Sequence, residues 1–314
     1  MTLTRFVKAL VYEASTPTTR VQERIPEPEL VMNDSQQVKS YMESCKRVMT
    51  PVYLFCCAQV ANLIQPGMTV LDLGCGSGAV LCMIASMHPE SEFIGFDLSE
   101  NMLQHAQAEI DEMNLKNVKL VKGDMTDFLE QHGDTTSQDE LTRFKQASFD
   151  VVMCTNALHH LPDEKALQKC FANISQVLKK EDGSLYLLDF LHVRSEKTMH
   201  LLSHFHEEEQ EELFTQDYAN SLKAAFFKDQ ILHAMKSLPS DGCELFTTFG
   251  VSFLFCIKKE GNRSSNESST KLSTRHQETL LQMKREMIPS KALQHDLEGL
   301  KMLFKLGGLR TNYL

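Results

Sequence analysis

Two aspartates and two glycines in this chain are spaced as in sites that bind a ribose-containing cofactor. Asp72 lies in an apolar run that Gly74 and Gly76 follow at once, and Asp97 closes a second apolar run about 25 residues after Asp72. Glycine has no Cβ, so the backbone can turn sharply and approach a ligand closely. An acid at about this distance typically accepts hydrogen bonds from ribose hydroxyls. The pattern predicts a cofactor bound where two strands end.

A strand, a tight turn and a helix N-terminus must position these residues. The apolar run Thr69–Leu73 has the length of a strand, and Ala79–Met87 is helix-like and directly follows the glycine-rich turn. A dinucleotide dehydrogenase is the rival interpretation, because the turn also satisfies the looser G-x-G-x-x-G/A pattern. Asp72 argues against it, since a dehydrogenase does not require an acid just before the glycines.

Five short segments stand in the order and at the spacing of the class I S-adenosylmethionine-dependent methyltransferases, which this chain resembles from about Gln65 to Lys259. They are Leu71–Gly78, Gly95–Ser99, Gly123–Met125, Phe149–Val152 and Ala157–Asp163. The third segment ends a strand at the place where these methyltransferases hold adenine. The resemblance therefore implies S-adenosylmethionine as the cofactor.

The resemblance also implies which residues contact that cofactor. The glycine-rich turn would lie under the methionine part, Asp97 would accept both ribose hydroxyls, and Asp124 would accept from the adenine amino group. Leu98 and Met102 would flank the adenine, with Met125 near the ring. The full predicted set is Tyr41, Asp72, Gly74, Cys75, Gly76, Asp97, Leu98, Met102, Asp124, Met125, Asn156 and Ala157.

Two adjacent histidines, His159 and His160, follow the fourth strand, at the edge where ligands bind in open sheets. A base is needed only if the methyl acceptor is an oxygen or carbon acid. Imidazole titrates near working pH, so either ring is a candidate general base, and we favour His160. The pair recurs in the resembling family across unlike substrates, so a structural role or a role in holding the cofactor is favoured over a role as base.

A second group of histidines precedes an acidic run, an arrangement that can bind a metal ion when the spacing is right. His200 and His204 are four residues apart, on one face of a helix, with Glu207–Glu212 beyond them. No H-E-x-x-H order is present, and methyl transfer needs no metal. We therefore expect a solvated acidic face here and no metal site.

Strand-like runs alternate with helical segments along the central part of the chain. The runs are Val70–Leu73, Phe93–Phe96, Lys119–Lys122, Phe149–Thr155 and Ser184–Phe190, and then Glu244–Phe249 and Ser252–Lys258 on either side of Gly250. This alternation predicts an α/β fold: a Rossmann-like, doubly wound, mostly parallel seven-stranded sheet with helices on both faces. The last two strands should form an antiparallel finish.

The predicted organisation has four parts. Residues 1–64 form an N-terminal extension with cofactor-covering helices, and residues 65–260 form the methyltransferase domain, with insertions at 130–147 and 192–238. A Ser-rich linker covers residues 261–270 and a helical C-terminal tail covers 271–314. Because the linker separates the tail from the last strand, we expect truncation at Gly261 to leave a folded domain. The tail is a candidate for self-association.

Composition limits the partners and the location. The formal net charge is −10 over 314 residues, whereas a nucleic-acid partner usually demands a basic face, so we expect a small-molecule substrate and no nucleic acid. No apolar run approaches the roughly 20 residues of a membrane span, and we expect no signal peptide. The nine cysteines include no C-x-x-C pair, which indicates reduced thiols in a cytoplasmic protein.

The favoured function is a methyltransferase that acts on a small molecule through oxygen, nitrogen or carbon. One alternative is a cofactor-binding protein of the same fold that acts mainly through association with a partner. Another is a protein or RNA methyltransferase. The acidic charge argues against an RNA substrate. No motif of the Asn-Pro-Pro-Tyr type, which serves amino-group methylation in RNA or protein methyltransferases, follows the fourth strand.

Overall fold

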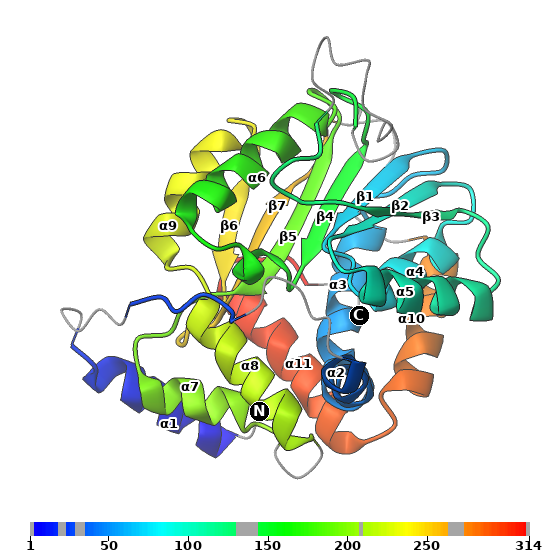
Figure 1. Ribbon diagram of the computed structural model, residues 1–314. Coiled ribbons are helices and arrows are strands. Elements are labelled where there is room, and N and C mark those ends of the chain that lie inside the picture. The colour runs from blue at the N-terminus through cyan, green and yellow to red at the C-terminus, as the bar shows by residue number, and fades with distance from the viewer. Residues whose placement is uncertain are drawn as a thin grey trace.

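The computed structural model describes residues 3–17, 23–28, 35–129, 144–206, 210–262 and 273–311. Within these residues, seven strands form one sheet in the order β3-β2-β1-β4-β5-β7-β6 (Figure 1). This is the predicted Rossmann-like fold. The strands are β1 (Thr69–Leu73), β2 (Glu92–Asp97), β3 (Val118–Lys122), β4 (Val151–Thr155), β5 (Ser184–Phe190), β6 (Glu244–Thr247) and β7 (Leu254–Lys259).

The order in which successive strands are added reverses at β1, which pairs in parallel with both β2 and β4. From β1 the chain first builds outward through β2 and β3, then returns to build β4 and β5 on the other side. The loops that leave β1 and β4 therefore diverge, and a crevice opens between them at the carboxyl ends of the strands. The fold thus places the glycine-rich turn and the histidine pair at one site.

Alternate residues of the central strands pack into two separate cores, one on each face of the sheet. Val151 and Met153 of β4 belong to one core, and Val152 and Cys154 belong to the other. A strand that is buried on both faces must be apolar throughout, which is why this run does not alternate with polar residues. The helices on the two faces are α3 (Thr50–Ala61), α4 (Ala79–Met87) and α5 (Glu100–Glu112), opposite α6 (Glu164–Val177) and α9 (Lys228–Ala234) (Figure 1).

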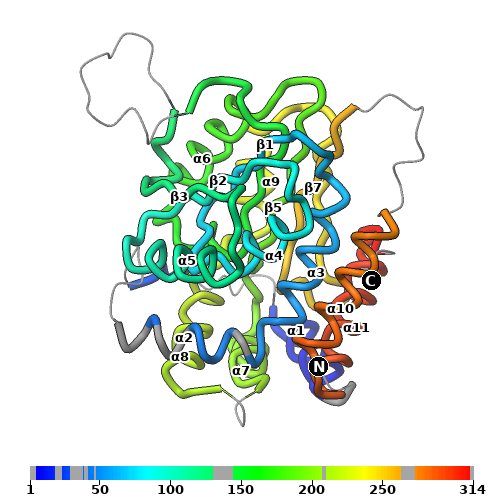
Figure 2. The backbone as a smooth tube through the Cα atoms, turned by 90° about the vertical axis from the view of Figure 1, so that its right-hand side faces the viewer, coloured from blue at the N-terminus to red at the C-terminus, as the bar shows by residue number. Residues whose placement is uncertain are grey.

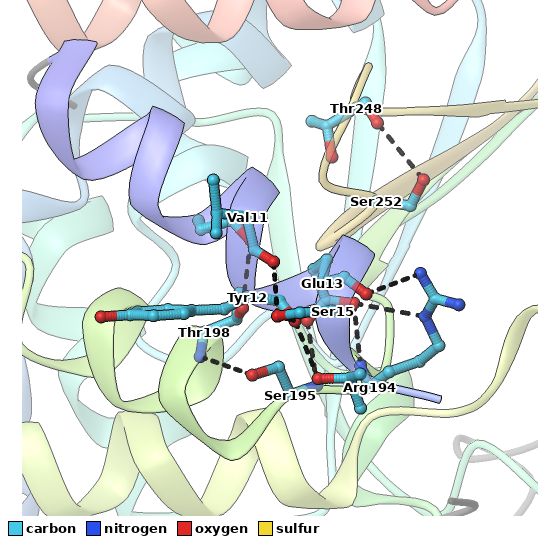
Figure 3. Close-up of polar contacts among 11 residues, drawn as sticks. Val11, Tyr12, Glu13, Ser15, Arg194, Ser195, Thr198, Thr248 and Ser252 are labelled. Carbon is cyan, nitrogen blue, oxygen red and sulfur yellow. Dashed lines mark hydrogen bonds and ion pairs between the residues drawn. The ribbon is translucent and has the colours of Figure 1, made fainter. Parts of the chain in front are cut away.

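Four helices gather beyond the carboxyl end of the sheet (Figures 1 and 2). Glu13 joins two of them: its carboxylate accepts the backbone N–H groups of Arg194 and Ser195 at 3.1 and 2.9 Å, just before the second helix begins (Figure 3). The described residues of the predicted insertion 192–238 are mainly helical, as expected. The four helices are α1 (Leu3–Ser15), α2 (Ser35–Val48), α7 (Glu196–Ser203) and α8 (Glu212–Ala224).

The antiparallel finish is confirmed, but its turn is wider than predicted. The Thr248 hydroxyl donates to the Val251 carbonyl at 2.8 Å and accepts the Phe253 N–H at 3.1 Å. Gly250 lies inside this turn with a φ of +80°, a conformation that favours glycine. The Thr248 side chain thus takes the place of ladder hydrogen bonds, so β6 ends at Thr247 and β7 begins at Leu254.

The C-terminal tail is helical and divided at Pro289, as predicted, into α10 (Thr274–Met287) and α11 (Lys291–Leu306). The expectation that it can be removed at Gly261 is not supported by its packing. Phe304 stacks on Phe55 of α3 with ring centroids 5.1 Å apart, and the apolar face of α11 is buried in the same core as α3. Helix α3 is apolar on every side because it lies between α4 and this tail.

Parts of the predicted segments lie outside the described residues. They include 18–22 and 29–34 of the N-terminal extension, 130–143 and 207–209 of the two insertions, 263–270 of the Ser-rich linker, and 271–272 and 312–314 of the tail. Within the described part of the chain, every helix is too short or too polar to cross a membrane.

Candidate active site

A cleft of about 410 Å³ occupies the crevice at the carboxyl ends of the strands. Its floor comes from the loops that follow β1, β2, β3 and β4, and α8 and the segment 23–28 cover it. The volume lies in the range of small-molecule sites, roughly 300–1,000 Å³. Ten of the twelve predicted cofactor residues line it: Gly74, Cys75, Gly76, Asp97, Leu98, Met102, Asp124, Met125, Asn156 and Ala157.

The glycine-rich turn needs its glycines for two different reasons. Gly74 has a φ of +69°, and a Cβ there would lie 2.3 Å from the Cβ of Ala157, so the turn could not pack against the loop after β4. Gly76 has a φ of +53°, yet a Cβ there would meet nothing within 4 Å. Gly76 therefore faces the open cleft, where its bare backbone can lie against a ligand.

Asp97 hydrogen-bonds to the loops that follow β1 and β2. Its Oδ2 accepts the Gly76 N–H at 2.8 Å and its Oδ1 accepts the Ser99 N–H at 2.8 Å. Burial raises the pKa of this carboxyl, and the backbone N–H groups of Ser99, Gly76 and Leu98 partly oppose that rise. Each carboxylate oxygen has a second lone pair with which it can accept a ligand hydroxyl.

Asp72 lies deeper than a simple binding role would suggest, whereas Cys75 lines the cleft. Asp72 is 1% exposed, does not line the cleft, and its Oδ1 has no hydrogen-bond partner. Burial, together with the charge of Asp97, raises the pKa of Asp72 well above its usual range. Burial also raises the pKa of the Cys75 thiol, so Cys75 is a small packing residue and not a thiolate.

The predicted adenine residues surround the outer part of the cleft. Leu98 is 39% exposed, whereas Met102 is buried beside it at the start of α5. Asp124 is fixed by the Thr126 N–H, which its Oδ1 accepts at 2.7 Å. Met125 lies near Gly74, with its methyl carbon 3.3 Å from the position of a Cβ there. Tyr41 belongs to α2, but its side chain lies outside the described residues.

Asn156 offers an unused hydrogen-bond acceptor inside the cleft. Its φ is +52°, a left-handed conformation that asparagine tolerates better than most residues. Its Oδ1 is buried and has no hydrogen-bond partner, although a buried polar atom is normally satisfied. An unpaired acceptor in a binding cleft is what a ligand donor would complete.

His159 is held from two sides by Asp189, the penultimate residue of β5. Asp189 Oδ1 lies 2.7 Å from His159 Nδ1, and Oδ2 accepts the His159 backbone N–H at 3.0 Å. Since a carboxylate only accepts, the proton is on Nδ1, and Nε2 is left on the side of Glu27, whose Oε1 is 4.0 Å away. Burial disfavours the charged ring, but the nearby carboxylates outweigh it and raise the pKa of His159.

His160 has the opposite environment. Burial and the adjacent His159 lower its pKa to about 3, and its Nδ1 is buried without a hydrogen-bond partner. A ring that remains neutral to such low pH is a weak proton acceptor. The surroundings therefore favour His159 over His160, the reverse of the preference drawn from the sequence.

Arg24 holds the segment 23–28 against the loop that carries His159 and His160. It donates to the carbonyls of His159 at 2.9 Å, Pro162 at 2.6 Å and Ala224 at 2.6 Å, and its guanidinium lies 4.0 Å above the centre of the Phe226 ring. This clamp positions Glu27, whose Oε1 accepts from the Ser221 hydroxyl at 2.8 Å. Burial raises the pKa of Glu27.

Glu27 and Asp189 were not among the site residues predicted from the sequence. Asp189 could have been found, because a lone acid in the otherwise apolar run of β5 must have a buried partner. Nothing in the sequence pointed to Glu27, since it lies among prolines in an irregular segment. Glu27, His159 and His160 place one potential metal-ligand atom each within 4.8 Å of one another.

Known proteins with sequences similar to this chain include methyltransferases. A family model described as "Methyltransferase domain" matches residues 64–226. The chain is 24% identical over 159 residues to N-methyltransferase 4 of Papaver somniferum, with 51% of this chain and 36% of that protein covered. It is 29% identical over 208 residues to malonyl-[acyl-carrier protein] O-methyltransferase of Bacillus cereus, with 64% and 67% covered.

A similar solved structure is that of the plantazolicin methyltransferase BpumL in complex with SAH. It has a TM-score of 0.52 and 13% identity, and the match covers 73% of this chain and 91% of that one. The chain spans little more than a third of the first curated relatives that it matches, 36% and 38% of their lengths. The family match extends over more than half of this chain and contains the loops that form the floor of the cleft, so the chain belongs to the class I S-adenosylmethionine-dependent methyltransferases.

Proposed function

We propose that this protein transfers a methyl group from S-adenosylmethionine to a hydroxyl of a small-molecule acceptor, and that His159 accepts the hydroxyl proton. The observation that carries the proposal is the Asp189–His159 pair, with Nδ1 bonded to the carboxylate and Nε2 left toward the cleft. An oriented base of this kind is needed for an oxygen acid, whereas a free amine already has a lone pair.

The residues of the cleft fit the cofactor. Bound S-adenosylmethionine supplies an electrophilic methyl group on a cationic sulfur. Asp97 would hold the ribose hydroxyls, and the backbone at Gly76 leaves room for the chain that links ribose and sulfur. Asn156 Oδ1, unpaired in the cleft, would accept from the ligand.

The protein's part in the reaction is to position two molecules and remove one proton. The acceptor oxygen forms a bond to the methyl carbon while the carbon–sulfur bond breaks, and the electron pair of that bond stays on sulfur. The hydroxyl proton moves to His159 Nε2, and Asp189 stabilises the resulting imidazolium. The cover held by Arg24 limits the access of water to this step.

The test measures transfer of labelled methyl from S-adenosylmethionine to a small-molecule fraction of cell extract. His159→Gln should lower transfer about 100-fold while cofactor affinity, measured by isothermal titration, stays within a factor of two to three. His295→Gln is the matched control, since His295 is an exposed residue of α11. Label found only in protein or RNA would overturn the small-molecule assignment, and full transfer by His159→Gln would overturn the base.

The spacing of Glu27, His159 and His160 makes metal dependence a specific alternative. Sulfonium methyl transfer needs no Lewis acid, so we expect dialysis against EDTA to leave the rate unchanged. If EDTA abolished transfer and added Zn²⁺ restored it, the cluster would be a metal site, and His159 would not be the base.

We further propose a cytoplasmic location and self-association through the C-terminal tail. The nine cysteines all lie in described residues and are free, which supports the proposed cytoplasmic location. Self-association through the tail would have to use exposed apolar side chains such as Leu281 and Leu306. The other apolar side chains of α10 and α11 are mostly buried in the core that contains α3.

A further inference from the structure

A second cavity, of about 270 Å³, lies beside the cofactor cleft. Its wall is mostly apolar and is built from α1, the start of α3, α7, α8 and α11, with Phe190 and Leu254 from the sheet. The space is partly open to solvent, so a ligand that filled it would remove apolar surface from water. We call this space the apolar chamber.

The apolar chamber adjoins the cleft. Met49, Asn156, Phe190 and Tyr218 line both. A molecule with its body in the chamber would therefore have its end beside the cleft. At the junction stands Asn156, whose buried Oδ1 has no hydrogen-bond partner.

Several other polar groups in the chamber wall have partners within the protein. His206 Nε2 lies 3.1 Å from Asp296 Oδ2, and Gln210 donates to the Ser203 carbonyl and the Thr215 hydroxyl, both at 2.6 Å. The chamber consequently presents mostly apolar surface to a ligand. Asn156 Oδ1 is a buried acceptor that a ligand donor would complete.

The electrostatic character of the junction restricts the ligand further. Glu27, Asp217 and Asp189 lie around the reactive end of the cleft or directly behind it. A carboxylate or phosphate on the ligand would be repelled by these groups. A neutral hydroxyl meets no such repulsion.

We infer that the apolar chamber binds the body of the methyl acceptor, and that the acceptor is an elongated apolar molecule with a terminal neutral hydroxyl. The inference rests on the proposed function and names the substrate class of the same site. The hydroxyl lies between Asn156 and His159, and the apolar body extends toward α11. The C-terminal tail is therefore a wall of the acceptor site, and the exposed Met302 stands at its outer rim.

Gly299 of α11 provides a clean way to fill the chamber. It lines the chamber, and a Cβ there would meet nothing within 4 Å. Its φ is not in the left-handed region, so a side chain adds no backbone strain, and leucine is a better helix former than glycine. Gly299→Leu should therefore fold at least as well as the native chain while occupying acceptor space.

The experiment uses 4-alkylphenols with ethyl, butyl, hexyl and octyl chains, titrated into the full-length protein in the presence of S-adenosylhomocysteine. Affinity should rise roughly fourfold for each added methylene until the chamber is full. Gly299→Leu should flatten this series and weaken octylphenol binding by tenfold or more. His295→Leu, which adds leucine to the exposed side of the same helix, should leave the series unchanged.

The outcomes separate this inference from the proposed function, because S-adenosylhomocysteine affinity is measured first for every variant. If the cofactor product binds but phenol affinity does not depend on chain length, the apolar chamber does not hold the acceptor. The same conclusion follows if Gly299→Leu and His295→Leu behave alike. If the cofactor product fails to bind the native chain, the proposed function itself is wrong.

Discussion

Asp189 grips His159 at both its ring and its backbone, with 2.7 Å to Nδ1 and 3.0 Å to the amide nitrogen. The two contacts fix the position of the loop after β4 as well as the orientation of the imidazole. Both residues are almost fully buried, at 1% and 3% exposure, so the pair is shielded from competing water. A buried carboxylate that orients a histidine is expected where that histidine must accept and hold a proton.

The first prediction concerns the pH dependence of methyl transfer. Only neutral imidazole accepts a proton, and the pKa of His159 is raised above the ordinary value of 6.5. The rate at low acceptor concentration should therefore rise with pH through a midpoint above 6.5. Asp189→Asn should move this midpoint to lower pH and reduce the maximal rate about 100-fold. A midpoint unaffected by Asp189→Asn would separate the pair from the proton transfer.

Stability should respond to pH in the opposite sense. Because the folded-state pKa of His159 is raised, its contribution to the free energy of unfolding is complete below its unfolded pKa and is lost as pH rises through the folded pKa. Urea denaturation of the native chain between pH 6 and 9, compared with His159→Gln, would measure this. Parallel pH curves for the two proteins would refute the assignment.

The second prediction concerns Asp97. Asp97→Ala removes the acceptor for the ribose and the link between Gly76 and Ser99. We expect cofactor affinity to fall by more than tenfold, a loss of roughly 2 to 4 kcal/mol. Isothermal titration measures it, with Asp111→Ala on the exposed side of α5 as control. Unchanged affinity in Asp97→Ala would mean that the ribose binds elsewhere.

The third prediction uses two glycines that share a conformation but not a location. Gly76 and Gly67 have φ values of +53° and +82°, and a Cβ at either position meets nothing within 4 Å. Substitution by alanine should cost each protein about 1 to 2 kcal/mol of stability. Cofactor affinity should fall only in Gly76→Ala, because only Gly76 faces the cleft. Equal affinities in the two variants would show that the cofactor does not approach this turn.

The fourth prediction replaces the expectation of a removable tail. Phe304 is fully buried against Phe55, so Phe304→Ala should destabilise the protein by about 3 to 5 kcal/mol. Leu306→Ala, at a position that is 57% exposed, should change stability by less than about 0.5 kcal/mol. Thermal unfolding compares the two. A chain that ends at Gly261 should lose its cooperative transition, and a sharp transition in that chain would restore the idea of an independent domain.

The sheet, the glycine-rich turn and most of the residues that line the cleft could be predicted from the sequence because their signals are local. An apolar run followed by glycines and a helix reports its own structure, and Asp97 lies at a characteristic distance from that turn. Even the antiparallel finish was visible at Gly250, although the side chain of Thr248 decided where its strands end.

The part of the site around His159 depends on contacts between distant parts of the chain. Asp189 and His159 are 30 residues apart, and Arg24 reaches a carbonyl 135 residues away. No periodicity encodes such pairings, because they follow from how β4 and β5 align and how the cover segment folds back. The choice between His159 and His160 was open in the sequence, since their types and positions are alike. Burial and the neighbouring carboxylates set their proton affinities apart, and the same packing turned an apparent tail into a wall of the core.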